Sequence, residues 1–142
     1  MLHHLDRVQQ KFLADVGVDE RAALLIFNLA PLEARRDMAM LGLIHRTMLG
    51  KGPRHFREYF EREGDGQVVD HREAQRDTLL RRSAFGLAFV YNLLPKAIKR
   101  ETSVKGFQKS LQEIMKARAM DGCDDWSKTF SPRLAVDKHP LR

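Results

Sequence analysis

The sequence predicts an all-α protein: a small, irregular bundle of about five to six helices with an irregular C-terminal tail. Apolar residues recur at helical spacing through most of the chain of 142 residues. The apolar stretches also begin and end at residue types that cap helices. We find no internal repeat and no clear strand. The helical domain is therefore expected over residues 1–122, and the tail over residues 123–142.

The first two helices are indicated by their end signals. Gly17 supplies a stop for the first helix, and Asp19 is a good N-cap for the short apolar helix ERAALLIFNLA. The first helix carries apolar residues at helical spacing: Leu2, Leu5, Val8, Phe12, Leu13 and Val16.

A central helix is predicted over LEARRDMAMLGLIHRTMLG, with Pro31 in its first turn and Gly50 near its end. Its apolar residues point nearly all round the helix axis, which is typical of the buried centre of a bundle. Arg35 and Arg46 belong to its one charged strip, and His45 is interpreted as a core or surface histidine rather than a catalytic one.

The middle of the chain is less regular. A shorter helix is predicted over PRHFREYFERE, the residues 64–66 (Gly-Asp-Gly) indicate a turn, and residues 67–78 resemble a polar loop. Helix resumes near Leu79 and ends before Pro95. The aromatic residues of this helix are interpreted as core rather than as base-stacking side chains; they are Phe85, Phe89 and Tyr91.

The last long helix, VKGFQKSLQEIMKARAM, is capped by Ser103 and ends at Gly122. One side is expected to pack and carries Val104, Phe107, Leu111, Ile114, Met115 and Arg118. Another side is basic and carries Lys105, Lys109 and Lys116.

The charge is distributed unevenly. The formal net charge is +6 and the pI about 9.8. Residues 1–50 are neutral, whereas residues 83–142 contain eleven Lys and Arg against six Asp and Glu. Such a basic segment can be an electrostatic footprint for nucleic acid, or a solvated face that keeps the domain soluble. The candidate contacts to a nucleic-acid backbone are Arg35, Arg36, Arg81, Arg82, Lys96, Lys99, Arg100, Lys105, Lys109 and Lys116.

Several classes of protein are disfavoured. No apolar run is long enough to span a membrane, and the N-terminus has no signal-peptide pattern, so an intracellular setting is expected without distinguishing nucleus from cytoplasm. The single cysteine, Cys123, allows no intrachain disulfide and has no adjacent base. Asp124 and Asp125 form an acidic doublet of a kind that is common in loops. No known catalytic motif is present, and no cofactor or metal is expected.

Three stretches, taken in order, carry a resemblance to a known family. The first is LDRVQQKFL at 5–13, the second NLAPLEARRDMAMLGLIHR at 28–46, and the third YNLLP at 91–95 followed by SVKGFQKSLQEI at 103–114. Their order resembles the region after the polymerase domain in the reverse transcriptases of LINE-type (non-LTR) retrotransposons. The matching residues are Leu5, Val8, Gln9, Phe12 and Leu13; Pro31, Leu32, Arg35 and Arg36; Asn92, Leu94 and Pro95; and Ser103, Phe107 and Leu111.

The resemblance implies a C-terminal piece that supports a polymerase domain and contacts template RNA or target DNA. It does not imply catalysis, because the Tyr-x-Asp-Asp motif of these polymerases is missing: Tyr59 is followed by Phe-Glu-Arg and Tyr91 by Asn-Leu-Leu. Arg35 and Arg36 are equally compatible with a structural role, either pairing with Glu33 or Asp37 or capping another helix. Two other functions stay open: a helical protein-interaction module, and an inert relic fragment without nucleic-acid binding.

Overall fold

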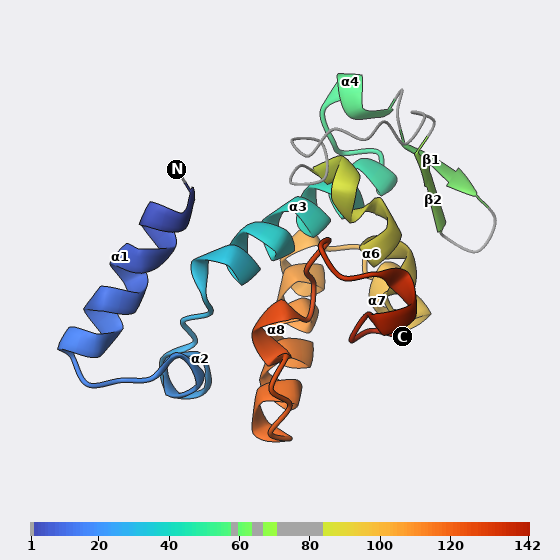
Figure 1. Cartoon of the computed structure of the whole chain (residues 1–142). Helices are drawn as coiled ribbons and strands as arrows, with labels where there is room; N and C mark the ends of the chain where they lie inside the picture. The colour runs from blue at the N-terminus through green and yellow to red at the C-terminus, as the bar shows by residue number, and fades with distance from the viewer. Residues whose placement is uncertain (1, 58–59, 64–66, 71–83) are drawn as a thin grey trace.

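The computed structural model describes residues 2–57, 60–63, 67–70 and 84–142 (Figure 1). This part of the chain is mostly helical, as predicted. The helices are α1 Leu2–Asp15, α2 Glu20–Phe27, α3 Leu32–Met48, α4 Arg54–Arg57, α6 Ala88–Leu93, α7 Lys96–Lys99 and α8 Val104–Met120. The other elements are the strands β1 Phe60–Glu63 and β2 Gln67–Asp70 and the 3-10 turns η1 Ala84–Leu87, η2 Trp126–Lys128 and η3 Val136–Lys138. Within the described part, no helix combines the length and apolar character needed to cross a membrane.

The long helix α3 runs through the centre of the molecule, as its all-round apolar pattern predicts (Figure 1). Leu41 and Ile44 are fully buried, and the helix packs on α8, α6 and the strand β1. Gly42 marks the closest approach to α8, because a Cβ atom there would lie 2.5 Å from Nε2 of Gln108. The α3–α8 pair therefore forms the middle of the core.

The caps lie where the sequence places them. The carboxylate of Asp19 accepts a hydrogen bond from the backbone N–H of Ala22 at 2.7 Å, and the hydroxyl of Ser103 accepts one from Gly106 at 3.3 Å. Gly17 follows α1 with φ of 71°, a left-handed conformation that glycine adopts without steric cost. These local signals fix the ends of α1, α2 and α8.

The middle of the chain corrects two predictions. Within the helix predicted over residues 53–63, residues 54–57 form one helical turn, α4, and residues 60–63 form a strand, while residues 67–70 form a second strand rather than a loop. The turn predicted at residues 64–66 lies outside the described residues. β1 and β2 pair antiparallel, with Phe60 opposite Asp70 and Glu63 opposite Gln67. Phe60 is buried and its ring stacks on Phe56 at 6.2 Å, so pairing and burial override the helical pattern of this segment.

Residues 71–78 of the predicted loop lie outside the described residues, as do residues 79–83 of the helix expected after it. From residue 84 the chain forms η1 and then α6, which ends before Pro95 as predicted. Pro95 is the N-cap of α7, a single helical turn that the sequence pattern did not predict. Tyr91 is only 1% exposed, consistent with its interpretation as a core residue.

The residues after α8 are irregular but not detached from the core. Trp126 and Phe130 belong to the same buried cluster as the residues of α3 and α8. Arg118 of α8 donates hydrogen bonds to the carbonyl of Pro140 at 3.2 Å and to Asp125 at 2.6 Å. The ring of His139 is also buried, and its burial lowers the pKa of the imidazole.

Candidate nucleic-acid interface

The helix α8 separates its apolar and basic sides as predicted. Phe107, Leu111 and Met115 are fully buried against the rest of the core. Lys105 and Lys109 are exposed on the other side, and Lys116 is half-buried in the same row, with its Nζ atom 3.7 Å from a carboxylate oxygen of Glu113. We call Lys105, Lys109 and Lys116 the lysine strip. Three ammonium groups spaced along one rigid helix are suited to follow a line of phosphates.

A shallow groove of about 410 Å³ runs beside the lysine strip. The groove lies between the end of α2 and the outer side of α8, and we call it the α8 groove. Nε2 of Gln112 donates hydrogen bonds to the backbone carbonyl of Asn28 at 3.1 Å and to its side-chain oxygen at 2.9 Å, which fixes the groove wall. The residues that line the groove are Asn28, Gln108, Lys109, Gln112, Glu113 and Lys116.

Hydrogen-bond donors dominate the α8 groove. Lys109 and Lys116 supply charge, and the amide of Gln108 adds neutral donor groups. Glu113 is the one carboxylate among the lining residues, and it lies near Lys116. The groove therefore has the polarity to hold the oxygens of a phosphodiester backbone without reading base edges.

The one-turn helix α7 carries a second group of predicted contacts. Lys96 and Arg100 are exposed, while the Nζ atom of Lys99 donates a hydrogen bond to the carbonyl of Asn92 at 3.3 Å. α7 contacts α8, and Lys105 lies in the first turn of α8. The structure therefore brings the basic residues of α7 and the lysine strip onto neighbouring elements.

A small pocket of about 190 Å³ opens beside Lys99 and Arg100 and reaches His45. Nε2 of His45 lies 2.6 Å from the carbonyl oxygen of Glu101, and Nδ1 lies 2.9 Å from the Tyr91 hydroxyl. The ring also stacks on Phe107 with centroids 4.0 Å apart. Both ring nitrogens are thus engaged in holding the fold, which agrees with the interpretation of His45 as a core histidine.

Arg35 and Arg36 differ although they are adjacent. Nη2 of Arg36 contacts both carboxylate oxygens of Asp6, at 2.9 and 3.1 Å, and so joins α3 to α1. The structural role weighed for Arg36 is therefore present, although its hydrogen-bonded partner is Asp6 and not Glu33 or Asp37. Arg35 is exposed, and no contact described in residues 2–57 and 84–142 links it to the lysine strip. Arg81 and Arg82 lie outside the described residues.

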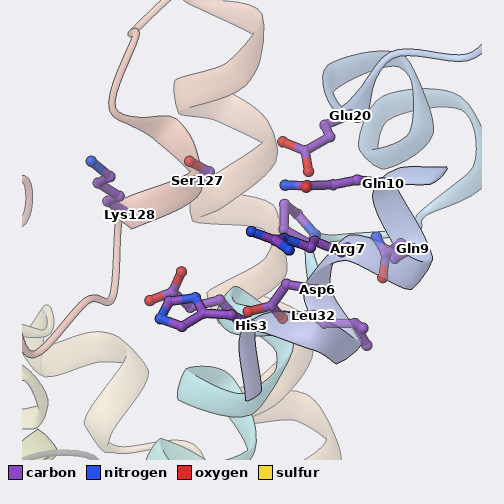
Figure 2. Close-up of a pocket in the computed structure, with 11 residues that line it drawn as sticks. His3, Asp6, Arg7, Gln9, Gln10, Glu20, Leu32, Ser127 and Lys128 are labelled. Carbon is purple, nitrogen blue, oxygen red and sulfur yellow. The ribbon is translucent and has the colours of Figure 1, made fainter. Parts of the chain in front are cut away.

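A cleft that the sequence gave no reason to expect lies on the other side of the molecule, between α1 and the C-terminal tail (Figure 2). It has a volume of about 310 Å³. Figure 2 shows Arg7 extending from α1 toward Ser127 and Lys128 of the tail, with Gln10 between Arg7 and Glu20. The charged residues that line the cleft include Asp6, Glu20 and Glu33 as well as Arg7 and Lys128, so lysine does not predominate there as it does in the α8 groove.

Asp37 is a largely buried carboxyl on α3. Burial, together with the negative charge of the neighbouring Glu33, raises the pKa of Asp37 to about 7, although Arg133 and Arg36 oppose the rise. Nη1 of Arg133 lies 3.2 Å from Glu33, which connects the tail to α3. The sequence signalled none of this, because residue 133 meets residue 33 only in the folded chain.

Among the described residues, no group of three His, Cys, Asp or Glu side chains is placed to hold a metal ion. Of the acidic doublet, Asp125 is engaged by Arg118. The backbone carbonyl of Cys123 accepts a hydrogen bond from Arg21 at 3.5 Å, and the thiol of Cys123 forms no disulfide.

Comparisons of the chain with protein-family models, with curated proteins and with solved structures find no match.

Proposed function

We propose that this chain is a non-catalytic nucleic-acid-binding domain that holds the phosphate backbone of RNA or DNA on α7 and α8. The proposal also draws on the resemblance of the sequence to LINE-type reverse transcriptases. In those proteins the similar region follows the polymerase domain, and we propose that it supports that domain. The observation that carries the proposal is the lysine strip, which faces solvent along one side of α8 beside the donor-rich α8 groove.

The contacts available to this surface favour backbone binding over base recognition. Lysine ammonium groups bind phosphates as point charges, and the groove supplies amide donors between them. Tyr91, one of the aromatic residues weighed for base stacking, is buried and therefore not available to bases. Binding with little sequence preference and a steep dependence on salt is therefore expected.

The test is a titration of the purified chain with a structured RNA and with duplex DNA, from low to physiological salt. Changing Lys105, Lys109 and Lys116 together to Gln is expected to flatten the slope of log K against log salt by about two to three. The matched control changes Lys51, Lys128 and Lys138 to Gln, which removes the same charge from exposed positions outside the surface. Equal losses in both variants would show that only net charge matters and would remove the lysine strip from the proposal.

A second function, a helical protein-interaction module, is favoured by one observation. Apolar side chains of α1 face solvent rather than the core. The two functions use different helices and do not exclude each other. A chain that is folded by circular dichroism but binds neither RNA nor DNA at low salt would favour the second function.

A further inference from the structure

The helix α1 turns most of its apolar side away from the molecule. Leu5 is 54% exposed, Val8 66%, Phe12 56% and Val16 52%. The first three lie in α1, and Val16 follows its last residue, where its backbone N–H still donates a hydrogen bond to the carbonyl of Phe12 at 3.1 Å. Their spacing of three, four and four residues puts them in one continuous row. We call these four residues the α1 stripe. In Figure 1, α1 lies at the edge of the molecule, with its far side uncovered.

A different side of α1 attaches it to the protein. Asp6 pairs with Arg36, Gln9 donates a hydrogen bond to the carbonyl of Ala30 at 3.1 Å, and Leu13 is 4% exposed. Residues 6, 9 and 13 are centred about a quarter turn from the stripe at the helical period of 3.6 residues. The helix is therefore anchored mainly by polar contacts while its apolar stripe is left exposed, which is the reverse of an ordinary surface helix.

The end of α2 also exposes apolar side chains. Ile26 is 71% exposed and Phe27 64%. The carbonyl that holds Gln9 belongs to Ala30, which is three residues beyond Phe27 and so within about 10 Å of it. The stripe and this pair together expose roughly 600 Å² of apolar side chain. That area is at the upper end of what monomeric proteins leave uncovered.

We propose that the α1 stripe binds a second copy of this chain, with the two α1 helices packed antiparallel about a two-fold axis. Such an interface uses the same patch on both subunits, so one self-complementary surface is sufficient. The proposed interface includes Ile26 and Phe27 at the end of α2 as well as the stripe. Two such patches would bury at most about 1,200 Å² of apolar surface, which is the lower limit for specific and stable interfaces.

The order of side chains along the stripe suits this arrangement. An axis between Val8 and Phe12 places Phe12 opposite Val8 of the second copy, and Leu5 opposite Val16 of the second copy. Each contact then joins a larger side chain to a smaller, β-branched one, so the two rows can interdigitate. A parallel pair would instead put Phe12 against Phe12 and leave gaps at the valines.

The charges beside the stripe set the strength of the pair. His4, Lys11 and Asp15 lie along one edge, and in the antiparallel pair Asp15 comes level with His4 of the second copy. Lys11 lies near the two-fold axis and so faces Lys11 of the second copy. Each chain also carries a net charge of +6. This repulsion limits the affinity to the micromolar range and is screened by salt, so the dimer is expected to tighten as salt rises.

Sedimentation equilibrium of the full chain tests the proposal, over protein concentrations from low micromolar to several hundred micromolar at two salt concentrations. The wild type is expected to dimerise, more tightly at the higher salt. Changing Val8 and Phe12 to Glu is expected to weaken the dimer at least about 100-fold. The control changes Gln10 and Ala14 to Glu, which adds the same charge to the opposite side of α1.

Both variants alter exposed positions, and circular dichroism checks that the helices are retained. A wild type that is monomeric throughout, or a control that loses the dimer as fully as the stripe variant, would overturn the proposal. The test is separate from that of the proposed function, because nucleic acid is absent and salt acts in the opposite direction.

Cysteine cross-linking tests the orientation of the helices. In a Cys123→Ser background, Val8→Cys and Phe12→Cys are prepared as separate proteins. Antiparallel pairing predicts that an oxidised mixture forms a disulfide between positions 8 and 12 faster than either protein alone forms a symmetric one. Faster symmetric linkage at position 12 would overturn the antiparallel arrangement.

Discussion

The imidazole of His45 joins the central helix to the start of α8, because its Nε2 atom lies 2.6 Å from the carbonyl oxygen of Glu101. A carbonyl can only accept, so Nε2 carries the hydrogen. In the neutral ring, Nδ1 then accepts from the hydroxyl of Tyr91 at 2.9 Å. One buried ring thus links α3, α6 and the segment that leads into α8.

Replacing this ring is expected to be costly. His45→Ala removes both hydrogen bonds and leaves a void beside Phe107, so the free energy of unfolding is expected to fall by about 3–4 kcal/mol. Tyr91→Phe removes the bond to Nδ1 but keeps the bond to Glu101, and should cost about 1 kcal/mol. Urea denaturation followed by circular dichroism measures both. If His45→Ala lost no more than Tyr91→Phe, the bond to Glu101 would contribute little.

The buried carboxyl of Asp37 is expected to make the protein less stable as the pH rises. Its pKa is raised from 3.8 to about 7 in the folded chain, so between these values the folded state binds more protons than the unfolded state. Stability is then greatest below pH 4 with respect to this group and is lost as the pH passes 7. Asp37→Asn should raise the free energy of unfolding at pH 8 by about 2–4 kcal/mol and flatten its pH dependence.

Urea denaturation at pH 5 and pH 8 checks the effect of Asp37→Asn. Asp124→Asn, which makes the same change at an exposed position, is the control. A loss of stability at pH 8 in Asp37→Asn would mean that the ionised carboxylate is favourably paired with Arg36 or Arg133.

The adjacent arginines of α3 should separate in their effects. Arg36→Gln breaks the ion pair with Asp6, in which the Arg36 side chain is 31% exposed and the Asp6 side chain 22%. The loss is expected to cost about 1 kcal/mol of stability. It should leave the affinity for RNA unchanged. Arg35→Gln should leave stability unchanged, because the side chain is exposed. The pair is compared by denaturation and by RNA titration, and a reversed pattern would contradict the structural role of Arg36.

The C-terminal tail should loosen when Arg118 is replaced. Arg118→Gln removes the bonds to Pro140 and Asp125, and trypsin is then expected to cleave near Arg133 and Lys138 several times faster. Trp126, the only tryptophan of the chain, is 7% exposed and should shift its emission to longer wavelength as it meets water. Lys116→Gln, on the same helix, serves as the control. Unchanged emission and cleavage would mean that Trp126 and Phe130 hold the tail without Arg118.

Local signals made the helix ends predictable. Asp19 and Ser103 accept the hydrogen bonds that N-caps accept, and Gly17 has the left-handed conformation expected after a helix. The buried and basic sides of α8 followed in the same way from the helical period. These features depend only on residues within a few positions of one another.

Features that depend on distant residues were not predictable. The stretch from Phe60 to Asp70 looked helical and then irregular, although its Gly-Asp-Gly centre between two four-residue runs is also a hairpin signal. The periodicity of α1 marked its apolar residues, but not that the core would cover Leu13 and leave Phe12 exposed. The pairing of Arg36 with Asp6, across thirty residues, depends on how α1 and α3 meet.

The packing of α3 against α8 has a consequence for the way the chain is made. The ribosome releases α3 long before α8, because residues 49–103 separate the two helices. Until α8 and Trp126 follow, Leu41 and Ile44 have no complete covering, and the nascent chain exposes a row of large apolar side chains. Closure of the core therefore waits for contacts between segments distant in sequence, and such contacts form slowly. During that interval the nascent chain is most exposed to aggregation and to capture by chaperones.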